Sequence, residues 1–294
     1  MSQQLPPSRD WTDDAAVDAV LDVVADTAHE IRGALCERRA ALDGENPTGD
    51  RTYAADDYAD ELLGARLLEC DAVAAYASEE RETVLEDEGT YHVAVDPLDG
   101  SSNLRSNNPM GTIVGVYDEP LPASGQDLVA AAYVLYGPNT TMLVADGDSV
   151  SEYLLAGDGE RRPLDEDVTV PADPTVYSFG GRRPDWPESV ESVVEAFEAE
   201  RLKLRYGGAL IADVTQVLTH GGVFAYPELE ERPEGKLRYC FECAPIGFLV
   251  ESAGGRVSDG EGPLLDRDPD ELHERTPFYV GDGDLVDRIE AELA

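Results

Sequence analysis

HVAVDPLDGSSN, residues 92–103, is an apolar β-type run that ends in a turn rich in carboxylate, hydroxyl and amide groups. Pro97 fixes its own φ angle, and Gly100 permits a backbone conformation or a close approach that other residues do not. Asp96 and Asp99 are therefore predicted to lie where a strand ends in a forced turn. The Gly-Ser-Ser-Asn sequence that follows supplies backbone N–H groups and hydroxyls, which together can bind a phosphate group.

A carboxylate pair beside a phosphate cradle predicts a magnesium-dependent phosphatase, because Mg²⁺ prefers carboxylates together with the phosphate oxygens of a substrate. Each piece alone has an ordinary structural explanation: Asp-Pro and Asp-Gly are common turns, and Ser-Ser-Asn is a common helix N-cap. The eight residues 96–103 in this order, directly after an apolar strand, favour the functional interpretation.

Helical and β-type patterns flank this stretch. Residues 13–42 place apolar side chains at helical spacing and predict an amphipathic helix, and residues 54–68 predict a second helix. A turn at residues 137–139 joins two β-type runs, so this part of the chain is predicted to form a meander. The predicted strands are residues 72–77, 92–95, 111–117, 128–136 and 141–145.

The chain changes character at residues 157–174, a polar interval rich in Asp and Pro. After it, predicted strands (175–179, 202–206, 223–226 and 278–281) alternate with predicted helices (187–199, 209–220, 242–253 and 285–293). A meander followed by this alternation predicts an α/β fold of the layered α+β kind, with mixed sheets sandwiched between helices. We expect two tightly joined halves: residues 1–170 with the metal and phosphate motif and the central hairpin, and residues 171–294 with a substrate-binding α/β layer.

The composition describes a folded protein with an acidic surface. The 294 residues include 62 acidic and 22 basic ones, a net charge of −40, yet 42 % are hydrophobic. Lysine occurs only at Lys203 and Lys236, and the other basic residues are arginine. Such a surface suits a salt-rich cytoplasm, because at about 1 M salt the Debye length falls to roughly 3 Å and the repulsion between like charges is screened.

This surface excludes nucleic acid as a partner, since no basic patch could replace the counterions of a phosphate backbone. No apolar run reaches the length of about 20 residues that a membrane-spanning helix needs, and residues 1–10 carry no apolar segment typical of a secretory signal. Four cysteines are too few for a disulfide scaffold of this size. We therefore expect a reduced, cytoplasmic protein that does not contact membranes.

Residues 96–103 resemble the signature of the lithium-sensitive, metal-dependent sugar-phosphatase superfamily, and the serine pair resembles that of class I fructose-1,6-bisphosphatases. The resemblance continues in family order along most of the chain and implies the sugar-phosphatase fold. The segments that carry it are residues 46–50 with Asp56, 78–80, 128–137, 205–214, 235–238, 242–255 and 273–277.

The resemblance implies a site for two or more Mg²⁺ ions, with Mn²⁺ as a substitute. The ions would polarise a phosphoryl oxygen and lower the pKa of a bound water. Glu80 is implied as the group that activates this water, helped by Asp56 and Asp50. The implied metal ligands are the side chains of Glu79, Asp96, Asp99 and Glu242 and the carbonyl of Leu98.

The resemblance also implies contacts to a sugar bisphosphate. The cleaved phosphate would meet Lys236 and the segment Asp99, Gly100, Ser101 and Ser102. The sequence also favours a phosphate-binding role for Lys236 independently of the resemblance, because a chain with two lysines places one of them in the motif Gly-Lys-Leu-Arg. The distal phosphate would meet Tyr206, Tyr226 and Arg205. In the family this arginine reaches across from a neighbouring subunit, which implies a homotetramer or at least a homodimer.

Two departures from the family pattern bear on the substrate. Gly180 stands where the family usually has an asparagine, and Arg183 stands at a tyrosine position, so the grip on the distal phosphate could move to Arg182 or Arg183. The expected reaction is hydrolysis of fructose 1,6-bisphosphate to fructose 6-phosphate and phosphate, a gluconeogenic step. The alternatives are a sedoheptulose-bisphosphatase or inositol-monophosphatase activity and, in a different class, a non-catalytic acidic protein that binds divalent cations.

Regulation by AMP is a further family property to which the sequence speaks. In the family, two basic residues hold the nucleotide phosphate: a lysine directly before a tyrosine, and an arginine. This chain has Thr90 before Tyr91, and the arginine position is assigned to Gln126. We therefore expect AMP not to inhibit this protein.

Overall fold

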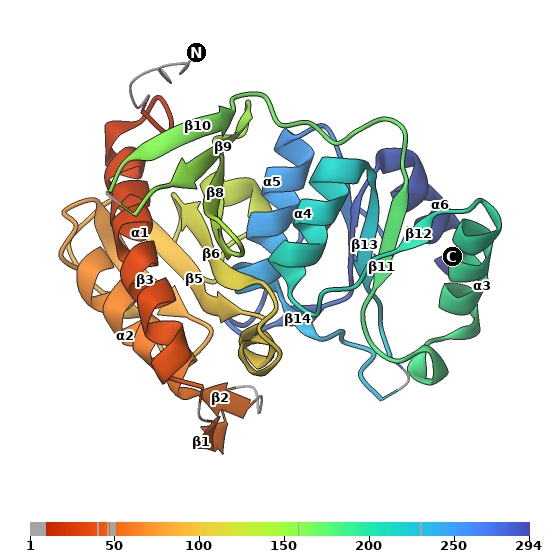
Figure 1. The fold of residues 1–294 in the computed structure, drawn as a ribbon, viewed down its shortest axis with the longest axis horizontal. Coiled ribbons are helices and arrows are strands. Elements are labelled where there is room, and N and C mark those ends of the chain that lie inside the picture. The colour runs from red at the N-terminus through yellow and green to blue at the C-terminus, as the bar shows by residue number, and fades with distance from the viewer. Residues whose placement is uncertain (1–9, 40, 46, 48–50, 158, 230) are drawn as a thin grey trace.

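The computed structural model describes residues 10–39, 41–45, 47, 51–157, 159–229 and 231–294. Its layers alternate as helix, sheet, helix, sheet, helix, with the chain crossing from the first sheet to the second after β10 (Figure 1). The predicted layered arrangement of mixed sheets and helices is confirmed.

The larger sheet has eight strands in the order β10-β9-β8-β7-β6-β5-β3-β4. All neighbours from β5 to β10 are antiparallel, which confirms the predicted meander, and β3 runs parallel to β5. The bounds are β3 Val73–Ser78, β4 Leu85–Glu86, β5 Tyr91–Asp99, β6 Met110–Tyr117, β7 Leu128–Tyr136, β8 Thr140–Ala145, β9 Val150–Leu155 and β10 Arg161–Asp165.

Two helices cover the outer face of this sheet: α1, Ala15–Ala34, and α2, Ala54–Leu67. The Asp14 side chain caps α1 by accepting from the backbone N–H groups of Ala16 and Val17. The predicted helix over residues 13–42 is too long, because Ile31 is the last residue of α1 that is buried. The chain continues as a 3₁₀ turn and the strand β1 (Ala41–Glu45), which pairs with β2 (Arg51–Tyr53).

The smaller sheet has the order β12-β11-β13-β17-β15, with β12, β11 and β13 parallel and the others antiparallel. Helices α3 (Glu188–Ala199) and α6 (Gly283–Leu293) cover its outer face. Its strands are β11 Val176–Phe179, β12 Lys203–Leu204, β13 Gly222–Tyr226, β15 Arg256–Ser258 and β17 Phe278–Gly281.

Helices α4 (Leu210–His220) and α5 (Ala244–Ser252) fill the layer between the two sheets (Figure 1). Their side chains form one apolar core with both sheets, and Ile211, Val214 and Leu249 are completely buried in it. Burial of this kind contributes about 25 cal/mol per Å² of apolar surface. The short pair β14 (Leu237–Arg238) and β16 (Arg275–Thr276) lies beside this layer. The end of β5 faces the start of α4, to which it is joined by hydrogen bonds.

Candidate active site

A β-bulge at the end of β5 brings the two aspartates of the signature segment to one side. Asp96 lies opposite Ile113 of β6 and Asp99 lies opposite Gly111, so β5 carries one residue more than its partner over this interval. Because side chains alternate between the faces of a regular strand, residues three apart would otherwise point in opposite directions. The hydroxyl of Thr112 donates to the carbonyl of Pro97 at 2.9 Å and stabilises the bulge.

Gly100 is required by both its conformation and its surroundings. Its φ angle is 73°, in the left-handed region, and a Cβ there would lie 2.3 Å from the Cβ of Ala209. The side-chain amide of Asn103 donates to the carbonyl of Gly207 at 2.8 Å. These contacts fix the Asp99–Ser102 turn against the segment that leads into α4.

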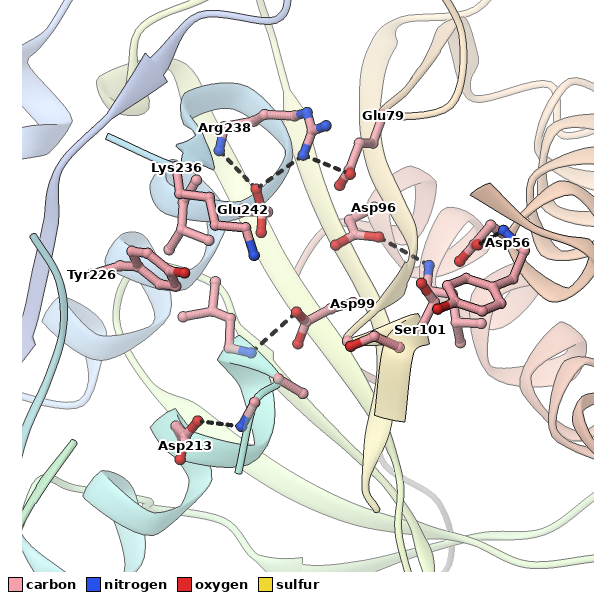
Figure 2. A pocket seen from close by; sticks show the side chains of 18 of the residues that line it. Asp56, Glu79, Asp96, Asp99, Ser101, Asp213, Tyr226, Lys236, Arg238 and Glu242 are labelled. Carbon is pink, nitrogen blue, oxygen red and sulfur yellow. Dashed lines mark hydrogen bonds and ion pairs between the residues drawn. The ribbon is translucent and has the colours of Figure 1, made fainter. Parts of the chain in front are cut away.

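Three carboxylates from distant segments meet beside this turn (Figure 2). Glu79 follows β3, Asp96 lies in β5 and Glu242 lies in the π-helical turn Tyr239–Cys243 that precedes α5. Each offers a carboxylate oxygen, and these oxygens lie within 4.8 Å of one another. All three residues are at most 9 % exposed. Such π-turns occur often at functional sites, and this one directs Glu242 toward the other two acids.

Arg238 joins this cluster, although no role for it was predicted from the sequence. Its guanidinium Nη1 lies 2.6 Å from Glu79 Oε1 and 3.8 Å from Glu242 Oε2, and its backbone N–H donates to Glu242 Oε2 at 2.7 Å. The available signal was its position four residues before Glu242 in the Gly-Lys-Leu-Arg motif. Arg238 is itself buried, so one cation faces the three buried acids.

Asp99 lies in the same pocket but points to the start of α4. Its two carboxylate oxygens accept from the backbone N–H groups of Leu210, at 3.1 Å, and Ile211, at 2.8 Å. This geometry places a carboxylate on the positive end of the helix dipole. Asp213, which the sequence analysis also did not assign, accepts from the backbone N–H groups of Gly207 and Gly208 at 2.7 and 3.2 Å and shapes the loop before α4.

Burial sets the charge state of these acids. It raises the pKa of Asp99 to about 7 and that of Glu242 to about 8, and it raises the pKa of Asp96 well above its usual value. The repulsion from Glu79 adds to each shift. Ionising several of these groups together is costly unless a cation joins them. The donor set, three close carboxylate oxygens in an acidic pocket, therefore fits a hard divalent cation.

Asp56 holds the start of α2 against the signature turn. Its Oδ2 accepts from the backbone N–H of Tyr53 at 2.6 Å, and its carboxylate accepts from the Ser101 hydroxyl. Burial raises the pKa of Asp56 to about 7. Asp50, the other acid implied for activation of water, lies outside the described residues.

The structure gathers most of the predicted site residues around one pocket of about 260 Å³. The Nζ atom of Lys236 lies 5.3 Å from the centroid of the Tyr226 ring, and its side chain extends toward the acids (Figure 2). Arg205 is not among the described residues that line the pocket. The predicted residues that do line it are Asp56, Glu79, Glu80, Asp96, Leu98, Asp99, Gly100, Ser101, Ser102, Tyr206, Tyr226, Lys236 and Glu242.

The two departures near the distal side have structural explanations. A Cβ at Gly180 would lie 2.4 Å from the Tyr226 ring, so this ring occupies the space that a larger side chain would need. Arg183 forms ion pairs with Glu191 and Glu195 on α3, at 3.2 and 2.8 Å. The guanidinium of Arg183 is thus directed to a helix surface, which argues against the predicted use of this residue for the distal phosphate.

Family models cover nearly all of the chain. Residues 20–161 match the N-terminal domain of fructose-1,6-bisphosphatase, and residues 170–294 match its C-terminal domain. The chain belongs to the fructose-1,6-bisphosphatase family. It is therefore a phosphoric monoester hydrolase.

Relatives in this family share most of the length. The class 1 fructose-1,6-bisphosphatase of Natronomonas pharaonis is 58 % identical over 280 residues, which cover 95 % of this chain and 99 % of the relative. That of Haloarcula marismortui is 54 % identical over 277 residues, which cover 94 % of each chain. Both relatives are haloarchaeal, which supports the adaptation to salt that was predicted from the acidic composition.

Solved structures share the fold. A fructose-1,6-bisphosphatase from Leishmania major in holo form superposes with a TM-score of 0.90 at 27 % identity, over 96 % of this chain and 95 % of that one. A protein from Toxoplasma gondii described as a putative sedoheptulose-1,7 bisphosphatase gives a TM-score of 0.87 at 28 % identity, over 95 % and 94 %. In the part of this fructose-1,6-bisphosphatase family member that the structure describes, no helix is long and apolar enough to span a membrane.

Proposed function

We propose that this chain hydrolyses the 1-phosphate of D-fructose 1,6-bisphosphate with Mg²⁺ as cofactor, in the cytoplasm, as a step of gluconeogenesis. The observation that carries the proposal is the meeting of Glu79, Asp96 and Glu242 beside the Asp99–Ser102 turn and Lys236. An acidic cluster alone would only bind cations. The adjacent backbone cradle and ammonium group supply what a phosphate ester needs.

Some of the acids in the pocket would bind the cofactor, and others would transfer a proton. Glu79, Asp96, Asp99, Glu242 and the Leu98 carbonyl would hold two or more Mg²⁺ ions, for which Mn²⁺ could substitute. The chemistry that bound metal ions would supply there is polarisation of the phosphoryl group and a lower pKa of a nearby water. Glu80 would accept the proton of that water, assisted by Asp56 and Asp50. A base in this position typically contributes a factor of about 10²–10⁴ to the rate.

The remaining pocket residues would orient the substrate. Ser101, Ser102 and the backbone at Gly100 would receive the phosphate that is cleaved, and Lys236 would donate to it as a compact cation. Tyr206 and Tyr226, which also line the pocket, would contact the distal phosphate.

We propose that the active unit is a homotetramer or at least a homodimer. Arg205 follows the edge strand β12 and is not one of the described residues around its own chain's pocket. The neighbouring Leu204 and Tyr206 are 59 % and 50 % exposed. An edge strand with exposed apolar side chains is suited to contact with a second copy, into whose site Arg205 would reach.

Phosphate release in molar KCl tests the proposal. Fructose 1,6-bisphosphate, sedoheptulose 1,7-bisphosphate and inositol monophosphate would be compared with and without Mg²⁺ or Mn²⁺. We expect turnover only with metal and the highest kcat/KM for fructose 1,6-bisphosphate. A higher kcat/KM for the seven-carbon substrate would identify a sedoheptulose-bisphosphatase. Metal binding without turnover of any of the three would support the non-catalytic alternative.

A further inference from the structure

A second cavity of about 540 Å³ lies at the C-terminal end of α1, and it shares no described lining residue with the active-site pocket. No aspartate or glutamate occurs among its described lining residues, in a chain with 62 acids. Two arginines do occur there. The described lining residues are Arg32, Leu35, Cys36, Arg39, Leu104, Asn107, Asn108, Pro109, Met110, Tyr136, Gly137 and Pro138.

The positive charges of these two arginines are not neutralised by any carboxylate in the described chain. Arg32 donates to the Thr140 hydroxyl and, at 2.8 Å, to the Gly137 carbonyl. Arg39 donates to the Arg105 carbonyl at 2.9 Å. Carbonyl and hydroxyl groups accept hydrogen bonds but carry no net charge, so the cavity keeps two cationic groups beside it.

Other arginines close to α1, unlike Arg32 and Arg39, form ion pairs with acids of the described chain. Asp22 and Glu30, both on α1, form ion pairs with Arg161 and Arg66, at 2.5 Å each. Acids are therefore available along α1, yet none within the described chain reaches Arg32 or Arg39. Among the described residues this arrangement lacks an anionic partner, which an anion from solution would supply.

We propose that this cavity binds a small phosphomonoester, such as a phosphorylated sugar, as a ligand distinct from the substrate. Guanidinium groups bind phosphate oxygens through paired hydrogen bonds, and the Asn107 and Asn108 amides add neutral donors. Leu35, Met110 and Tyr136 supply an apolar wall for the carbon skeleton of the ligand. The volume lies within the range of about 300–1,000 Å³ that is usual for small-molecule sites.

The position of the cavity would allow its ligand to act on the active site. Leu104, in its wall, belongs to the 3₁₀ turn Ser101–Arg105, and Ser101 and Ser102 at the start of that turn line the active-site pocket. A ligand that orders this turn would therefore change the phosphate cradle. The proposal does not depend on the identity of the substrate.

Cys36 provides a local reporter of occupancy. It is exposed and lines the cavity, whereas Cys70 is half-buried and lies elsewhere. The metal-free protein in molar KCl would be alkylated with iodoacetamide, and both cysteines followed by peptide mass spectrometry. We expect millimolar ribose 5-phosphate to slow alkylation of Cys36 several-fold and leave Cys70 unchanged, while ribose has no effect. Inorganic phosphate would show whether the phosphate group alone suffices.

Two variants decide between a specific site and a general effect of charge. Arg39→Gln should abolish the protection of Cys36 by ribose 5-phosphate. Arg38→Gln removes the same charge one residue earlier, where the guanidinium lies 3.7 Å from the centroid of the Tyr58 ring instead of lining the cavity, and should keep the protection. Absence of protection in the unaltered protein, equal slowing of Cys70, or full protection in Arg39→Gln would each overturn the proposal.

Discussion

The carboxylates of this chain fall into two groups that differ in their surroundings. On the surface, Arg66 lowers the pKa of Glu30 and Arg288 lowers that of Glu200 through hydrogen bonds. In the active-site pocket, burial raises the pKa of Asp96, Asp99 and Glu242. A carboxylate on the surface is thus a solvent-exposed anion paired with arginine, whereas a carboxylate in the pocket requires a cation to become ionised.

The difference shows that a functional acid cannot be identified in this chain by residue type. Among 62 acids, a pair such as Glu79-Glu80 has a high chance of being solvated surface. The functional set is distinguished by its position at strand ends and at a π-turn, where several carboxylates are buried with fewer cations than acids.

Replacing an acid from each group should give the largest contrast. Glu79→Gln removes one of the three converging carboxylates and should abolish measurable phosphate release and weaken Mg²⁺ binding, because the remaining oxygens cannot complete the ligand set. Glu30→Gln removes an equal charge from the surface and should leave kcat unchanged. Activity of Glu79→Gln within roughly tenfold of the unaltered protein would show that Glu79 is not a ligand.

Glu80 should separate proton transfer from metal binding. Glu80→Gln should lower kcat by a factor of about 10²–10⁴, since a general base contributes that much, while the affinity for Mg²⁺ measured by calorimetry changes little. Glu82→Gln, a nearby exposed acid, is the control. Full activity in Glu80→Gln would exclude the role of a base.

An intermediate effect is expected for the residues that hold the Glu79-Glu80 turn. Arg81 forms an ion pair with Asp60 of α2 at 2.8 Å, and its carbonyl lies 2.8 Å from His273 Nε2. Asp60 lies one helical turn after Asp56. Arg81→Gln should therefore lower kcat by about 10- to 100-fold, as changes around metal ligands commonly do.

The control for this effect is Arg256→Gln, in which the arginine lost has a side chain 35 % exposed, close to the 31 % of Arg81. It should change the unfolding midpoint by a similar amount and leave kcat intact. If the two variants lose activity in parallel with stability, the role of Arg81 is only structural.

Without metal, stability should depend on pH through the buried acids. The pKa of Asp99 is about 7 and that of Glu242 about 8 in the folded protein, both above their unfolded values of about 4. Between these limits the folded state binds more protons than the unfolded state. The free energy of unfolding in EDTA should therefore fall as pH rises from about 5 to 8, by about 1.4 kcal/mol per pH unit for each proton.

Denaturant unfolding in molar KCl measures this slope. Mg²⁺ should remove it, because the bound cation favours the ionised carboxylates. Glu242→Gln should reduce it, while Glu30→Gln should not, since the pKa of Glu30 is lowered and lies below this range. A free energy that rises with pH in EDTA would contradict the burial of protonated acids.

The sequence alone predicts the parts of this molecule that depend on local pattern. The apolar run before Asp96, the α2 helix and the alternation after residue 175 are visible in spacing, and they are confirmed. The strand β10 was not predicted, because buried and exposed side chains do not alternate along it. The end of α1 was misplaced because Leu35 continues the helical spacing, although it lies beyond the last residue of α1 and only packs against the edge of the core, partly buried.

The geometry of the site depends on long-range contacts that spacing does not record. Arg238 meets Glu79 across 159 positions of the sequence, and only the folded chain brings them to 2.6 Å. The bulge that turns Asp96 and Asp99 to one side depends on the pairing of β5 with β6. A family resemblance can imply the ligand set, but the sequence pattern cannot show which acid is bound to α4 and which faces its neighbours.

The smallest expected effect is that of AMP. Tyr91, the retained contact of the family's nucleotide site, donates to the Asp14 carboxylate at 2.7 Å, and the charge of Asp118 also acts on it. Gln126, assigned from the sequence as the second contact, instead donates to Asp266 at 3.0 Å. The surroundings of Tyr91 are therefore acidic where the family has cations, and two charge-assisted hydrogen bonds of about 1.5–3 kcal/mol each are missing. At about 1.4 kcal/mol per tenfold change in affinity, their loss weakens the binding of AMP by two to four powers of ten.

We expect millimolar AMP to leave phosphate release unchanged in molar KCl, and Thr90→Lys combined with Asp118→Arg to increase the sensitivity of the protein to AMP. Half-inhibition of the unaltered protein by micromolar AMP would show that the acids around Tyr91 do not exclude the nucleotide.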